Sequence, residues 1–73
     1  MTRVETHVRV VVNGEPRELQ AGRSVADLLE GLGLHPGMIV VELNREILER
    51  ARLASVEVRD GDVLELVHFV GGG

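Results

Sequence analysis

The sequence contains no cysteine and a single aromatic residue, Phe69. Without cysteine, disulfides, thiolate metal sites and cysteine nucleophiles are excluded. Small secreted domains usually carry disulfides, so we expect a cytoplasmic protein. One aromatic side chain provides no stacking platform for bases, and the net charge of −4 is unlike the basic surface of a nucleic-acid-binding domain. We therefore expect no nucleic-acid partner.

Long hydrophobic runs are also missing, and no stretch approaches the length that spans a membrane. Residues 1–7 lack the apolar segment of a signal peptide, and we expect them to form a flexible leader. The length of 73 residues is enough for one domain, which we place at residues 8–69. The apolar content of 44% is ordinary for a chain that folds around a core.

Alternation and turn signals divide this domain into strands and one helix. Ser24 is the predicted N-cap of the helix, and Pro16 favours an edge position for the second strand. Residues 49–56 fit either a helical turn or an irregular crossing. The strands are expected over residues 8–12, 16–20, 38–43, 47–48 and 63–69, with Asn13-Gly14 as a hairpin turn, and the helix carries an apolar stripe of Val25, Leu28, Leu29 and Leu32.

A helix with one apolar stripe buries it most economically on one face of a sheet. The order of elements therefore predicts an α+β fold of the β-grasp type, as in ubiquitin-like proteins. Its sheet would be mixed and four- to five-stranded, with one main helix packed on one face. In such a sheet the first and last strands are central neighbours.

The opposite face of this sheet is expected to carry apolar residues among charges. Arg9, Glu42 and Glu65 should point to solvent, and residues of the same parity in each strand point the same way. Such a set is typical of a partner site, although scattered apolar residues on an open sheet are also ordinary. The predicted partner-binding residues are Val11, Met38, Val40, Val67 and Phe69.

The sequence ends in Val70, Gly71, Gly72 and Gly73, which we expect to form a flexible tail. Glycine has no Cβ, so such a tail can enter a channel too narrow for side chains. Its reactive group is the terminal carboxylate, which is ionised at neutral pH and needs activation before it reacts as an electrophile. The tail therefore predicts a substrate for an enzyme that adenylates Gly73; a merely disordered end is the alternative.

No other constellation predicts chemistry. The three histidines are scattered and have no metal-ligand spacing. No nucleophile, base and orienting group stand together in the sequence. We therefore expect a carrier or co-substrate that has no catalytic residues and binds no metal or cofactor of its own.

Several stretches of the chain resemble the thiamine-biosynthesis sulfur-carrier family (ThiS). They are Asn13-Gly14, residues 22–29, residues 39–47 and, most specifically, residues 60–73, where Val67-His68-Phe69-Val70 precedes the glycines. The resemblance implies that an E1-like enzyme uses ATP to adenylate Gly73. It further implies that a sulfur donor, such as a cysteine desulfurase, converts the adenylate to a thiocarboxylate, and that thiazole synthase accepts the sulfur.

Relatives of this family leave other recipients open. The small subunit of molybdopterin synthase has a similar fold and a Gly-Gly end, and other carriers serve tRNA thiolation. A ubiquitin-like protein modifier needs the same tail, because adenylation is also its first step. The resemblance places thiazole formation first, with these roles as alternatives.

Overall fold

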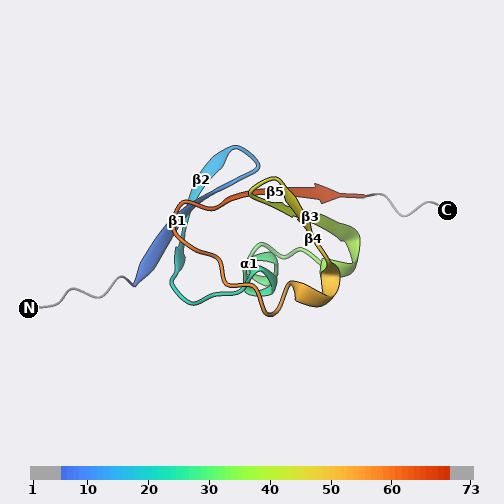
Figure 1. The fold of residues 1–73 in the computed structure, drawn as a ribbon, viewed down its shortest axis with the longest axis horizontal. Helices are drawn as coiled ribbons and strands as arrows, with labels where there is room; N and C mark the ends of the chain where they lie inside the picture. Colours follow the sequence, from blue (N-terminus) through green and yellow to red (C-terminus); the bar gives the residue numbers. More distant parts are fainter. Residues whose placement is uncertain (1–5, 70–73) are drawn as a thin grey trace, which may run out of the picture.

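A computed structural model describes residues 6–69 as a five-stranded sheet with one α-helix across one face (Figure 1). The strand order is β2-β1-β5-β3-β4; β1 and β5 are parallel, and the other neighbouring strands are antiparallel. This arrangement confirms the predicted β-grasp fold and the central position of the first and last strands. The elements are β1 (His7–Val12), β2 (Glu15–Gln20), α1 (Val25–Gly31), η1 (Pro36–Met38), β3 (Ile39–Leu43), β4 (Glu46–Leu48), η2 (Arg50–Arg52) and β5 (Val63–His68).

Element boundaries differ from the prediction by one residue in several places. β1 begins at His7, within the predicted leader, because His7 pairs with Gln20 of β2. Met38 belongs to the 3-10 helix η1 and not to β3, since Pro36 starts a helical turn there. The ambiguous segment 49–56 contains η2, a 3-10 helix of three residues. β2 is an edge strand, as Pro16 predicted.

Helix α1 begins at the predicted cap. The Ser24 Oγ accepts a hydrogen bond from the Asp27 N–H at 3.0 Å, and the Asp27 carboxylate accepts one from the Ser24 N–H at 3.0 Å. This reciprocal capping box satisfies two backbone donors that the first helical turn leaves without partners. The bond from the Ser24 backbone N–H, followed by the Ser24 side chain, lowers the pKa of the Asp27 carboxyl.

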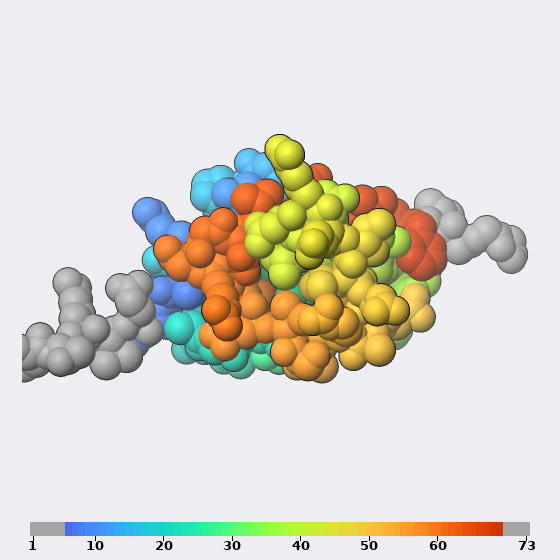
Figure 2. Space-filling model, viewed as in Figure 1, coloured from blue at the N-terminus to red at the C-terminus, as the bar shows by residue number. Residues whose placement is uncertain are grey.

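The crossing between η2 and β5 lies against the start of α1, as the orange and teal surfaces show (Figure 2). The Val25 N–H donates to the Val56 carbonyl, and the Ala26 N–H donates to the Leu53 carbonyl, both at 2.9 Å. Leu53 and Val58 are buried in the core. The segment between η2 and β5 therefore adds two apolar side chains to the core. It also accepts hydrogen bonds from two backbone N–H groups at the N-terminus of α1.

The core lies between α1 and the sheet and contains only apolar residues among those that the structure describes. The parity predictions for β1 and β5 are confirmed, because the inward members of both strands are buried. Burial of each such side chain contributes roughly 1.5–3 kcal/mol. The core residues are Val8, Val10, Val12, Val25, Leu28, Leu29, Ile39, Val41, Leu53, Val58, Leu64 and Leu66.

Candidate functional site

Strand β5 carries the chain from the centre of the sheet to the glycine end of the sequence. It pairs with β3 from Leu64 to His68, and the Phe69 N–H donates to the Met38 carbonyl at 3.1 Å. The backbone is thus held by the sheet as far as Phe69. The predicted tail, residues 70–73, lies outside the described residues. The last described position is therefore a fixed base for the segment that carries Gly73.

The face of the sheet opposite α1 exposes an apolar group at this end of β5. Val40 and Val67 are paired across β3 and β5, and they are 39% and 57% exposed. Phe69 is the residue directly after β5 and is 39% exposed. We call these three residues, Val40, Val67 and Phe69, the tail-side patch. Their proximity agrees with the predicted outward parity of both strands.

Met38 lies next to this patch but is placed by different geometry. It is half-buried in η1, so the alternation of a strand does not govern its side chain. Its carbonyl accepts the Phe69 N–H, which brings its backbone beside the base of the tail. The predicted outward orientation of Met38 extended the parity of β3 one residue too far.

Val11, the fifth predicted residue, lies at the other end of β5. It is half-buried and pairs with Val63, which is 44% exposed. Val63 and Val67 are four residues apart in β5, about 13 Å at the rise of a strand. Glu65 lies between them and pairs with Glu42 of β3. The five predicted residues therefore form two groups separated by a pair of carboxylates.

Two exposed apolar residues on this face were missed by the sequence analysis. Val63 has the parity of Glu65, so alternation within the last strand was a sufficient signal for it. Ile47 is 70% exposed and pairs with Glu42. Its face depends on the register between β3 and β4, which a strand of three residues does not reveal.

Within residues 6–69, no group of three or more histidine, cysteine, aspartate or glutamate side chains could hold a metal ion. His7 lies in β1, His68 lies in β5, and His35 caps η1 by accepting the Gly37 N–H at 3.0 Å. The described helices also include none that is long and apolar enough to cross a membrane. The features that the described residues place next to the tail are the tail-side patch and the end of β5.

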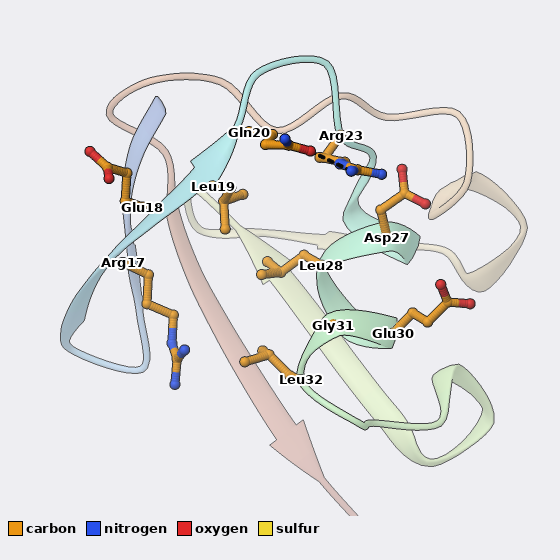
Figure 3. Close-up of a pocket in the computed structure, with 10 residues that line it drawn as sticks. All are labelled: Arg17, Glu18, Leu19, Gln20, Arg23, Asp27, Leu28, Glu30, Gly31 and Leu32. Atoms are coloured by element: carbon orange, nitrogen blue, oxygen red, sulfur yellow. Dashed lines mark hydrogen bonds between the residues drawn. The ribbon is translucent and has the colours of Figure 1, made fainter. Parts of the chain in front are cut away.

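A shallow groove lies on the helix side, between β2 and α1 (Figure 3). Leu28 of α1 and Leu32, the residue that caps its C-terminus, face Leu19 of β2 across it, and Arg23 donates a hydrogen bond to Gln20 at one end. β1 separates β2 from β5 in the sheet. The groove therefore belongs to the edge of the molecule away from the tail-side patch.

A five-stranded sheet of the order β2-β1-β5-β3-β4, with one helix across one face, defines the β-grasp class of ubiquitin-like proteins. Comparison with known proteins places the chain within this class. The model of the ThiS family matches residues 10–73. The chain belongs to the ThiS family.

Individual relatives agree with this assignment. The sulfur carrier protein ThiS of Bacillus subtilis (strain 168) is 46% identical over 50 residues, which are 68% of this chain and 76% of that protein. A crystal structure of a thiamine biosynthesis protein (ThiS) from Geobacter metallireducens has a TM-score of 0.76 and 36% identity. That match covers 90% of this chain and 100% of the other.

A longer protein also contains a similar stretch. The thiazole synthase of Paramagnetospirillum magneticum (strain ATCC 700264 / AMB-1) is 44% identical over 66 residues, which are 90% of this chain. The chain spans only 20% of the length of that synthase. The similar region is thus one part of a protein that has a further, larger part.

Proposed function

We propose that this chain carries sulfur on the carboxyl group of Gly73 for the formation of a thiazole ring. An E1-like enzyme would join the carboxylate to the AMP portion of ATP and release pyrophosphate. A persulfide sulfur would then displace AMP, and cleavage of the sulfur–sulfur bond by a thiol would leave a thiocarboxylate. In this scheme the carrier contributes an activated terminus, and the catalytic residues belong to its partners.

The observation that carries the proposal is the extent of the family match, which runs through the terminal glycines to Gly73. Adenylation requires a free carboxylate that reaches the nucleotide inside another enzyme. Three glycines provide this reach, because they have no side chains to obstruct a narrow channel. Phe69, held by the Met38 carbonyl, fixes the base from which the tail extends.

Thiazole synthase is the proposed recipient of the sulfur. Support comes from the thiazole synthase of Paramagnetospirillum magneticum, in which a region similar to 90% of this chain is part of the same polypeptide. Covalent linkage raises the effective concentration of two parts that work together. We propose that this chain delivers its sulfur to a thiazole synthase.

The tail-side patch is the proposed contact for both partners. All three residues are exposed on the sheet: Phe69 and Val67 lie one and three residues before the tail, and Val40 is paired with Val67. An aromatic side chain beside aliphatic ones is a common anchor of protein interfaces. Met38 adjoins this contact through its hydrogen bond to Phe69, whereas Val11 and Val63 form an outlying part of the same face.

The direct test is the intact mass of the carrier after incubation with the activating enzyme, ATP and a cysteine desulfurase with cysteine. We expect a mass gain equal to the replacement of one oxygen by one sulfur, located in the C-terminal peptide. A matched control lacks Gly72 and Gly73 but retains residues 6–69. The same gain in this truncated chain, or no gain in the full chain, would contradict the proposal.

A second measurement identifies the recipient. The thiocarboxylate form, mixed with thiazole synthase and its other substrates, should lose its sulfur while thiazole product accumulates in equal amount. If the carrier gains sulfur but the synthase leaves it intact, carriage is retained and the thiazole assignment is wrong. Conjugates between Gly73 and lysine side chains in cells would instead identify a protein modifier.

A further inference from the structure

Strand β5 is supported unequally along its two edges. On the β3 side the pairing continues to His68 and the Phe69 N–H. On the β1 side only Val63 and Leu64 have partners in a strand, because β1 ends at Val12 and the chain turns back into β2. The second half of β5, which leads to the tail, thus extends beyond the end of its parallel neighbour.

Asn13 is the first residue after β1, and its side chain makes hydrogen bonds to β5 where β1 no longer pairs with it. Its Oδ1 accepts the Leu66 N–H at 2.7 Å, and its Nδ2 donates to the Leu66 carbonyl at 3.2 Å. Its own backbone N–H donates to the Leu64 carbonyl at 2.9 Å. One residue of the hairpin turn therefore bonds the backbone of β5 at both Leu64 and Leu66, the second of which is 53 residues away in the sequence.

Asparagine is suited to this position for two separate reasons. Asn13 has a φ of 50°, a left-handed conformation that asparagine and glycine adopt more readily than other residues. Its amide also has both an acceptor and a donor, as a peptide group does. Glycine would satisfy only the backbone requirement, and aspartate would supply an acceptor without the donor. The Asn13-Gly14 turn signal accounts for the first reason alone.

Asn44 plays the corresponding part at the beginning of β5, on the opposite edge. It also has a φ of 50°, its Oδ1 accepts the Val63 N–H at 2.9 Å, and its Nδ2 donates to Asp62 at 3.0 Å. The two asparagines thus hold the two ends of one strand. Asn13 is the one at the end that leads to the tail-side patch and Gly73.

We infer that Asn13 is a positioning residue that fixes the direction in which β5 delivers the tail to the activating enzyme. Val67 and Phe69 come one and three residues after Leu66, so a loose Leu66 backbone displaces both patch residues and the base of the tail. A partner that recognises patch and tail together must then restore this geometry when it binds. The inference rests on the proposed function, and it assigns a role in docking and none in the chemistry at Gly73.

The test compares Asn13→Gly with Asn44→Gly. Each glycine keeps the left-handed turn and removes one side chain that bonds β5. The assay is ATP–pyrophosphate exchange by the activating enzyme with the carrier as the varied substrate. For Asn13→Gly we expect KM for the carrier to rise about five- to tenfold, the factor that corresponds to one or two ordinary hydrogen bonds. kcat should stay within about twofold of wild type, because the adenylated group is unchanged.

The thermal midpoint of Asn44→Gly should fall about as far as that of Asn13→Gly. Its KM for the carrier should nevertheless stay near the wild-type value. Amide exchange at Leu66 should accelerate in Asn13→Gly and not in Asn44→Gly. Asn13→Asp, which keeps the acceptor for the Leu66 N–H, should give an intermediate KM. Equal KM for Asn13→Gly and wild type, or equal increases in both glycine variants, would overturn the inference. If the wild-type carrier itself supports no ATP–pyrophosphate exchange, the proposed function fails instead. The rate of amide hydrogen exchange at Leu66 still reports whether Asn13 positions β5.

Discussion

Val67 provides the sharpest test of where partners bind on this protein. Val67→Thr preserves shape and β-branching and replaces one methyl group with a hydroxyl. Val67 is 57% exposed, so a partner can still cover more than half of it, worth about 1 kcal/mol, and replacing one of its two methyl groups removes about half of that. Burying an unpaired hydroxyl there adds about 1 kcal/mol of cost. Together these changes should raise KM for the activating enzyme about five- to thirtyfold.

Ile47→Thr is the matched control for this prediction. Ile47 is 70% exposed on the same face, but it lies on β4, two strands away from β5. If exposure of apolar surface alone determined binding, Ile47→Thr would have the larger effect. Because we place the contact at the tail-side patch, we expect it to leave KM unchanged.

The assay is pyrophosphate exchange at varied carrier concentration, with thermal unfolding of all three proteins as a check on folding. Both substitutions are at exposed positions, so their unfolding free energies should stay within about 0.5 kcal/mol of wild type. A wild-type KM for Val67→Thr, with folding intact, would refute the placement of the contact. An equal rise for Ile47→Thr would show that the contact extends over the whole face.

The other predictions concern stability. Leu29→Ala, at a fully buried position, should lower the unfolding free energy by about 2–5 kcal/mol, seen as a lower urea midpoint; a loss below about 1 kcal/mol would contradict its place in the core. Ser24→Ala should cost about 1 kcal/mol by thermal unfolding, because it removes the cap of α1. The pKa of Asp27 is lowered in the fold, so its stabilisation is present above the ordinary value of 3.8 and is lost as pH falls through the folded pKa. The midpoints of wild type and Asp27→Asn should therefore differ at pH 6 and converge in acid; a constant difference would refute this linkage. Gly61→Ala should destabilise the fold by about 1 kcal/mol or more, because Gly61 has a φ of +87°, whereas Gly31→Ala, which meets open space at the end of α1, should be neutral or stabilising.

Much of the fold was predictable because local patterns carried the information. The apolar stripe of α1 and the alternation in β1 and β5 reflect which side chains are buried. The spacing of apolar residues within each element is enough to predict this burial. The Ser24 cap was also a local signal, since both of its hydrogen bonds lie within four residues. The first and last residues of the strands were less predictable because they depend on pairing with a neighbouring strand. His7, for example, belongs to β1 because it pairs with Gln20.

The candidate site was predictable only in part. Parity correctly placed Val40 and Val67 outward, but it did not show that these two are paired while Val11 lies beyond Glu65. Met38 was assigned to a strand that begins one residue later. These differences arise because register and strand order are properties of contacts between segments far apart in the chain.

The apolar stripe of the helix, the inward residues of β1 and β5, the helix cap and the glycine end could all be predicted from residue type and local spacing, whereas Leu53 and Val58 of the core could not. The register between strands, the apolar residues that gather beside the tail, and the bonds from Asn13 to Leu66 emerge only from the three-dimensional fold. Those bonds join residues 53 apart in the sequence, and a turn motif contains no information about its distant partner. The physical reason is that side-chain chemistry is encoded residue by residue, whereas its use depends on which surfaces folding brings together.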